Sequence, residues 1–541
     1  MDVARSEGAF PVTPGGSRAE APRGMVATAF PEATEAGVEM LRRGGNAVDA
    51  ACAAALALAV CEPQGSGIGG QTMALLHVDG RTVAIDGSSH APALAHPSRL
   101  KSQRSRELGY KATTIPTTPA VLSYLNEHYG RLPWRALLEP AIHVAGSGYR
   151  ITRLQHLRQE TELAGFLRVP SRSGARYFLK NGTSPYTPGD LFVQEDLART
   201  LERLAAQGSS SLYTGSIAEQ IDADMRRHGG LLRADDLALP PEVVERPPLH
   251  GSYRGLEIRS FPPPGSGHTL LLILAMLEHF PPAFVAGDTP EAYRTLAEIQ
   301  RVALVDNRQR PHNPNTYPQS VAREETRAER AAELVAALRE TGPSLEVRPE
   351  RGSSGETTHL SVMDAEGNAI GLTQSVNLVY GARAAADGLG FLYNSYIEAF
   401  QYGRPGHYYN LRPGGIPWAS VAPTLVLHDG QPWLIAGSPG SHRIFASLAQ
   451  FLRWVIDGET SIETAMVRPR LFCSEEGELS VEGDRFDPSV TRHLEERGYR
   501  ITRYEPYAFY MGAVQAVLRR GSAPGFQGVA DVRRDGTAAG L

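Results

Sequence analysis

Glu356-Thr357-Thr358-His359-Leu360-Ser361-Val362-Met363-Asp364 is the stretch from which the fold of this 541-residue chain can be predicted. A threonine hydroxyl is a poor nucleophile at neutral pH and needs a base within hydrogen-bonding reach. If the peptide bond before Thr357 breaks, the freed α-amino group can be that base, because a pKa of about 7.7 to 8.0 leaves part of it neutral near pH 7. The stretch therefore predicts a chain that is cut between Glu356 and Thr357.

The flanks of this stretch predict a strand hairpin. Gly352–Gly355 reads as a flexible approach, and apolar Leu360 and Val362 alternate as they do on a strand that begins at Thr357. A tight turn over 364–368 leads into a second strand over 369–377. Taken alone, the same residues are also typical of an ordinary structural hairpin.

Further motifs occur in order along the chain: GGNAVDAA at 44–51, GIGG at 67–70, PPPGSG at 262–267 and GSPG at 437–440. Together with the Thr-Thr-His block they span nearly the whole sequence, which resembles the γ-glutamyltranspeptidase family. The resemblance implies the α+β fold of the N-terminal-nucleophile hydrolases, a four-layer αββα sandwich with two stacked, mainly antiparallel sheets between helices. It also implies a precursor that cuts itself into a large subunit, 25–356, and a small catalytic subunit, 357–541.

The resemblance assigns catalytic roles to particular residues. Thr357 matches the nucleophile, and Ser375 stands where the family has a threonine whose hydroxyl binds that nucleophile. Asn377 matches an asparagine that contacts the amino group of the substrate. Gly440 and Ser441 match a glycine pair whose backbone amides form an oxyanion hole, and serine keeps the required N–H. The machinery for acyl transfer is therefore expected to be complete.

The residues that grip a γ-glutamyl donor in the family are changed in this chain. Ser88 replaces an arginine that pairs with the α-carboxylate, Ala399 replaces an acidic residue that holds the α-amino group, and Tyr396 replaces a glutamine. One of two serines that fix the donor is now Ala419, whereas Ser420 is kept. Because charge-assisted hydrogen bonds contribute about 1.5 to 3 kcal/mol each, we expect weak recognition of glutamyl groups.

Nearby residues offer compensation for these losses. Glu398 precedes Ala399 and is a candidate for the amino group, while His90 is a candidate for a carboxylate, as are Arg404, Arg412 and His442. The substrate-binding candidates are therefore Ser420, Tyr396, Glu398, Ser88 and His90.

Three functions fit the sequence. The first is a self-processing amidohydrolase or acyltransferase that cleaves a small polar amide and passes the acyl group to water or an amine. The second is a literal γ-glutamyltransferase or glutathione hydrolase with a rebuilt pocket. The third is an inactive relative used for binding or as a scaffold. The first two need no metal and no organic cofactor.

The composition of the chain indicates which partners and which cellular compartment to expect. The apolar share of 42% and the net charge of −5 are typical of a globular protein without a nucleic-acid partner. The apolar runs are shorter than the 20 or so residues of a membrane span, and residues 1–24 are expected to be loosely ordered and lack the apolar core of a signal peptide. Three cysteines, Cys52, Cys61 and Cys473, favour a reducing compartment or a protein that is indifferent to redox conditions. These features predict a cytoplasmic protein.

Periodicity predicts the other elements. Helices are expected over 31–43, 46–60, 196–206, 290–307, 321–340 and 445–456, and strands over 72–77, 81–85, 255–260, 421–427, 432–436 and within 514–532.

Overall fold

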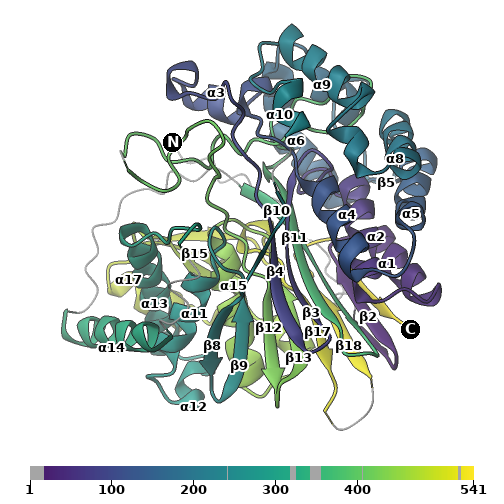
Figure 1. The fold of residues 1–541 in the computed structure, drawn as a ribbon. Coiled ribbons are helices and arrows are strands. Elements are labelled where there is room, and N and C mark those ends of the chain that lie inside the picture. Colours follow the sequence, from purple (N-terminus) through teal and green to yellow (C-terminus); the bar gives the residue numbers. More distant parts are fainter. Residues whose placement is uncertain (1–17, 240–241, 317–323, 342–354, 405, 522–524) are drawn as a thin grey trace.

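The computed structural model describes residues 18–239, 242–316, 324–341, 355–404, 406–521 and 525–541. Two seven-stranded sheets lie face to face in the middle of the molecule, with helices on both outer sides (Figure 1). The predicted four-layer αββα sandwich is confirmed. Among the described residues, no helix is both long and apolar enough to cross a membrane.

The first sheet contains the hairpin predicted around Thr357, and we call it the nucleophile sheet. Its strands, in spatial order, are β19 (Thr537–Gly540), β2 (Gly24–Thr28), β10 (Gly355–Asp364), β11 (Ala369–Leu378), β3 (Gln71–Val78), β4 (Arg81–Gly87) and β7 (Val244–Arg246). All its neighbours pair antiparallel. The chain therefore interleaves strands from before and after Thr357.

The second sheet stacks on the nucleophile sheet, and we call it the partner sheet. Its order is β1 (Arg18–Ala21), β18 (Phe526–Ala530), β17 (Gln515–Arg519), β13 (Gln431–Gly437), β12 (Thr424–His428), β9 (Leu256–Ser260) and β8 (Leu249–Tyr253). Apolar side chains from the two inner faces fill the space between the sheets, among them Met73, Leu75, Leu425, Ile435 and Val517. This alternation of inward residues is what stacked sheets require.

The helices divide between the two outer faces. Apolar residues from one group pack with Val362 and Leu372 of the nucleophile sheet: α1 (Pro31–Arg42), α2 (Ala47–Cys61), α4 (Thr118–Tyr129), α5 (Trp134–Ser147), α6 (Arg153–Arg168), α7 (Ser173–Phe178), α8 (Glu195–Gln207), α9 (Ser216–Arg227) and α10 (Ala234–Ala238). A second group packs with Val426 and Leu434 of the partner sheet: α11 (Gly267–Leu277), α12 (Pro282–Val285), α13 (Pro290–Gln309), α14 (Glu324–Thr341), α15 (Arg443–Ile456), α16 (Ile462–Met466) and α17 (Pro488–Glu496).

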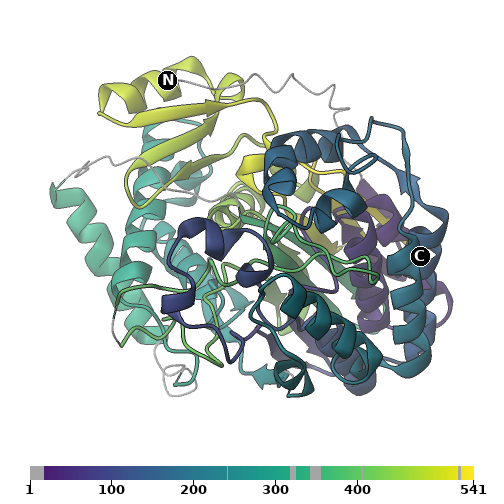
Figure 2. The ribbon, with the colours of Figure 1, turned by 90° about the horizontal axis from the view of Figure 1, so that it is seen from above.

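Smaller elements complete the fold. A three-stranded sheet of β14 (Leu471–Cys473), β15 (Glu478–Glu482) and β16 (Arg500–Tyr504) lies at one edge of the molecule (Figure 2). The strands β5 (Tyr149–Arg150) and β6 (Leu191–Phe192) form a short pair, and α3 spans Gln103–Glu107. Between β11 and β12, the described part of 379–423 forms only isolated bridges, and this irregular segment covers the end of the sheets.

Two expectations need correction. Residues 1–24 are not loose throughout, because Arg18–Ala21 forms β1 by pairing with β18 and Gly24 begins β2. The strand of the hairpin begins at Gly355, before the expected cut, because Gly355 and Glu356 pair with Leu378 and Asn377. The rest of the expected flexible approach, 352–354, and the start of the helix expected from 321 lie outside the described residues.

Candidate active site

Thr357 sits at an irregularity in the hairpin ladder. The pairing register shifts between Glu356 and Thr358, so Thr357 falls in a bulge of β10. Its side chain is buried, and its hydroxyl donates a hydrogen bond to Ser375 Oγ on the neighbouring strand β11 over 3.3 Å. A bulge releases one residue from the ladder and re-aims its side chain, which here brings the two hydroxyls together.

Ser375 connects the Thr357 hydroxyl to the carbonyl group in front of it. The Ser375 hydroxyl donates to the backbone oxygen of Glu356 over 2.7 Å and accepts from the Asn377 N–H over 2.8 Å. A continuous chain of hydrogen bonds therefore runs from Thr357 Oγ1 through Ser375 to the Glu356 carbonyl. This arrangement can move a proton away from the attacking oxygen while it polarises the carbonyl.

The glycine-rich motif at 67–70 packs tightly against the strand that carries Ser375. A Cβ atom on Gly70 would lie 2.3 Å from the Ser375 carbonyl oxygen, and one on Gly69 would lie 2.2 Å from the Leu392 carbonyl oxygen. No side chain fits in either gap, so glycine is required for this turn to press against β11.

The GSPG motif forms the turn between β13 and α15. Gly440 has φ +124° and Ser441 has φ +52°, and their carbonyl groups accept from the N–H groups of Arg443 and Ile444. Among the described residues, the backbone N–H groups of Gly440 and Ser441 have no hydrogen-bond acceptor, and they lie just before the positive end of the α15 dipole. The turn thus offers N–H donors that suit an oxyanion. The left-handed backbone of Ser441 carries a small strain energy.

Buried contacts brace the same turn. The Ser438 hydroxyl accepts from the Ala513 N–H over 3.0 Å. A Cβ atom on Gly437 would lie 2.2 Å from the His359 ring, which shares hydrogen bonds with Thr373 and Ser361. Burial lowers the pKa of His359 to about 3, so the ring is neutral at physiological pH.

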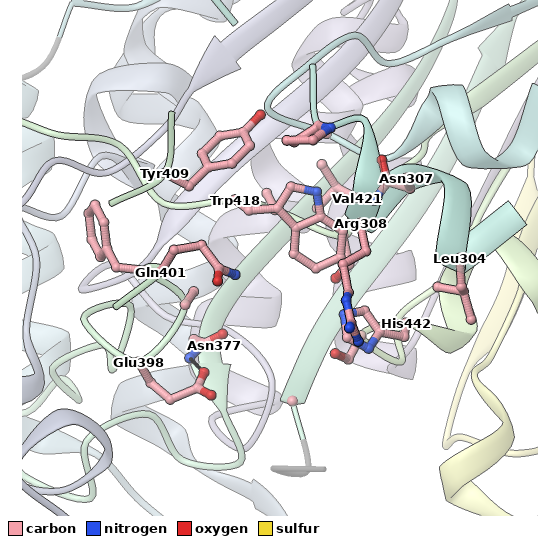
Figure 3. A pocket seen from close by; sticks show the side chains of 18 of the residues that line it. Leu304, Asn307, Arg308, Asn377, Glu398, Gln401, Tyr409, Trp418, Val421 and His442 are labelled. Atoms are coloured by element: carbon pink, nitrogen blue, oxygen red, sulfur yellow. Dashed lines mark hydrogen bonds between the residues drawn. The ribbon is translucent and has the colours of Figure 1, made fainter. Parts of the chain in front are cut away.

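A cavity of about 450 Å³ opens beside Thr357 (Figure 3). Of the predicted catalytic residues, Thr357, Ser375, Asn377 and Ser441 line it. Gly440 is not among the lining residues and contributes through the turn. Of the predicted substrate-binding residues, the cavity wall includes Ser420, Tyr396 and Glu398.

One corner of the cavity is polar and negatively charged. The Asn377 side-chain amide donates to Glu398 Oε2 over 3.2 Å and to the Ser395 carbonyl over 3.1 Å. Tyr396 is buried beside them, which raises the pKa of its phenol, and its hydroxyl interacts with Ser375 and Gln71. This corner offers hydrogen-bond acceptors to a cationic or amide group.

Ser88 and His90 lie elsewhere, and neither is among the described residues that line the cavity. The Ser88 hydroxyl donates to Asp86 over 2.6 Å, and Asp86 also forms an ion pair with Arg246 over 2.7 Å. His90 forms a backbone bridge with Ile115. In this conformation neither Ser88 nor His90 reaches the cavity wall, so their role as substrate ligands stays a prediction.

Aromatic side chains form a wall of the cavity that the sequence motifs did not predict. Trp418 stands in the middle of the cavity wall, and its ring centroid lies 5.1 Å from that of His442 (Figure 3). Phe400 and Tyr409 also line the cavity. Arg308 lies across from Glu398 and pairs with Glu475 over 2.8 Å. The aromatic residues between 400 and 418 are a visible signal, but only the folded segment shows that they face the cavity.

Two stacked antiparallel sheets between helical layers, with a threonine on a central strand beside a cavity, define an N-terminal-nucleophile hydrolase. Residues 33–541 match the family model described as gamma-glutamyltranspeptidase, and the chain belongs to this family.

Relatives and solved structures agree with this assignment. The chain is 33% identical over 525 residues to the glutathione hydrolase proenzyme of Escherichia coli (strain K12), covering 92% of this chain and 88% of the relative. It is also 33% identical to the acylase ACY 1 proenzyme of Pseudomonas sp. (strain V22), with coverages of 91% and 89%. The crystal structure of cephalosporin acylase from Bacillus halodurans superposes with a TM-score of 0.88 at 27% identity, covering 100% and 99% of the two chains. The chain is an amidohydrolase of this family.

Proposed function

We propose that this chain cuts itself between Glu356 and Thr357 and that the freed threonine then hydrolyses a small polar amide. The observation that carries the proposal is the chain of hydrogen bonds from Thr357 Oγ1 through Ser375 to the Glu356 carbonyl. Attack of Oγ1 on that carbonyl forms an ester as the C–N bond breaks, and the amide nitrogen takes up a proton to become the free α-amino group. Water then hydrolyses the ester and separates 1–356 from 357–541.

The two fragments are expected to stay together after the cut. In the nucleophile sheet, β10 from the second fragment pairs with β2 from the first, and β11 pairs with β3. Separation would break both ladders and expose the core between the sheets, which contains residues from both fragments. We therefore expect one tightly associated pair of fragments.

In turnover, Thr357 Oγ1 attacks the donor carbonyl while its own α-amino group accepts the hydroxyl proton. The amides of Gly440 and Ser441, at the positive end of α15, stabilise the oxyanion. The protonated α-amino group passes its proton to the leaving amine, and an acyl-enzyme forms. Water releases the acyl group, and an amine in the place of water would make the reaction an acyl transfer.

The cavity supports a donor that differs from a standard γ-glutamyl compound. Glu398 and Asn377 offer a polar corner for an amine or amide on the acyl group, while Trp418 and Phe400 supply apolar surface. Ser88, which replaces the family arginine, is held by Asp86 and does not line the cavity. A compact acyl group with a polar end fits these features best, and Arg404 and His442, which also line the cavity, are the groups that can meet a carboxylate.

A second candidate is the hydrolysis of γ-glutamyl compounds. Glu398 offers a carboxylate near Asn377 at which the α-amino group of a glutamyl donor can bind, in place of the acidic residue lost at Ala399. The relative from Escherichia coli is named a glutathione hydrolase, which supports this second candidate, whereas the relative from Pseudomonas is named an acylase.

The test combines intact mass with donor hydrolysis. Purified protein is weighed by mass spectrometry and assayed with a γ-glutamyl anilide and with anilides of small neutral and amino-bearing acids. Masses for 1–356 and 357–541 with faster release from the small non-glutamyl anilides support the first proposal, and faster γ-glutamyl release supports the second. A Thr357→Ala chain that still splits contradicts self-cleavage. The cytoplasmic location stays a prediction, which cell fractionation tests.

A further inference from the structure

Glu356, the residue in front of the expected cut, holds its carboxylate in a buried charged cluster. Arg534 Nη2 lies 2.9 Å from Glu356 Oε1 and donates to Oε2 over 3.1 Å, and both side chains are 1% exposed. Glu356 is close to Arg534 only in the folded chain, because 178 positions separate them in the sequence. Cleavage chemistry itself makes no use of this ion pair.

Arg534 is held in place for this contact. Its guanidinium stacks on the ring of Phe509 at 3.4 Å, and among the described residues its side chain donates hydrogen bonds only to Glu356. Burial raises the pKa of the Glu356 carboxyl, whereas Arg534 and the backbone N–H of Thr357 oppose that rise. The carboxylate therefore faces both the guanidinium and the amide of the bond to be cut.

We propose that Arg534 is a positioning residue for self-cleavage, and this inference rests on the proposed cut at 356/357. Glu356 is fixed at two points, since Ser375 binds its carbonyl oxygen and Arg534 binds its side chain. Gly65 packs on the same segment, because a Cβ atom there would lie 3.3 Å from the Thr357 carbonyl oxygen. These contacts hold the carbonyl beside Thr357 Oγ1, and small misplacements of reacting atoms are known to cost about 10²-fold in rate.

A second buried acid lies in the charge field of Arg534. Burial raises the pKa of the Glu62 carboxyl to about 8, and Arg534 is among the groups that oppose that rise. The charge of Arg534 in turn interacts with both Glu356 and Glu62.

The test measures the rate of cleavage at 356/357 by intact mass after the unfolded precursor is diluted into native buffer. We expect Arg534→Met to slow cleavage at least tenfold and Arg534→Lys, which keeps the charge, to slow it less. Arg254→Met is a matched control, because Arg254 pairs with the buried Asp457 at the far end of α15, and we expect it to leave the rate within threefold of the wild type.

A double variant separates positioning from a general structural role. If Arg534 acts through Glu356, Arg534→Met adds less than a twofold effect in a Glu356→Met background. Equal slowing in both backgrounds, or wild-type cleavage by Arg534→Met, overturns the inference. Thermal unfolding of each change on the Thr357→Ala chain checks that folding is kept at the assay temperature. A wild-type chain that never splits refutes the proposed self-cleavage itself, which is a separate result.

Discussion

Replacing Ser375 by alanine tests the hydrogen-bond chain most directly. The Ser375 hydroxyl donates a hydrogen bond of 2.7 Å to the Glu356 carbonyl and accepts one of 3.3 Å from Thr357 Oγ1. During the attack, negative charge develops on that carbonyl oxygen. Loss of one such donor typically costs about 2.7 to 4 kcal/mol, or 10²–10³ in rate. We therefore expect Ser375→Ala to cleave at least 100-fold more slowly than the wild type.

The assay follows formation of the 357–541 fragment by intact mass after the precursor refolds. Ser375→Thr is the matched control, because it keeps the hydroxyl and restores the residue type expected at this position in the family. We expect its rate to stay within a few-fold of the wild type. Cleavage of Ser375→Ala within threefold of the wild type would refute the proposed relay through Ser375.

Three further predictions concern the donor pocket, the oxyanion turn and acid stability. Glu398→Gln should raise KM for amino-bearing donors by about 10- to 100-fold, because it removes a charge-assisted bond of about 1.5 to 3 kcal/mol, and should leave KM for matched donors without the amine unchanged in steady-state assays. Gly437→Ala should lower the free energy of unfolding by about 1 to 3 kcal/mol in urea titrations, because its Cβ would overlap the His359 ring. His359 has a folded pKa of about 3 against about 6.5 unfolded, so its contribution to stability is complete above pH 6.5. That contribution falls by up to about 1.4 kcal/mol per pH unit as the pH drops toward 3. Urea titrations at several pH values in this range should therefore show that the free energy of unfolding falls less steeply with decreasing pH in His359→Gln than in the wild type. An equal dependence on pH in both proteins would contradict the buried neutral ring.

The hairpin around Thr357 shows which strands can be predicted from local sequence patterns and which cannot. Alternation at Leu360 and Val362 and the turn at Gly367, which has φ +92°, predict β10 and β11 because both signals lie within a few residues. The start of β10 was missed, because Gly355 and Glu356 join the strand only by pairing with β11. The pairing of Arg18–Ala21 with β18 was likewise not predictable, since those strands lie at opposite ends of the chain.

The predicted site residues likewise fall into those that line the cavity and those that do not. Motif order predicted that Thr357, Ser375 and Asn377 belong to one site, and all three line one cavity. The resemblance also suggested Ser88, but correspondence with a family position does not fix where a side chain points. In the structure the Ser88 hydroxyl donates to the carboxylate of Asp86, and Ser88 is not among the described residues that line the cavity.

By itself, the sequence indicated a candidate nucleophile and the hairpin that carries it, because these depend on residue types at short spacings. Motifs in a fixed order indicated the family, and the resemblance to that family implied the layered fold. Only the tertiary structure decided which groups surround Thr357. Glu398, Trp418 and Arg534 come from irregular segments or from the far end of the chain, and no periodic pattern specifies their neighbours. Their positions follow from long-range packing, in which burial and charge pairing bring together residues that are distant in the sequence.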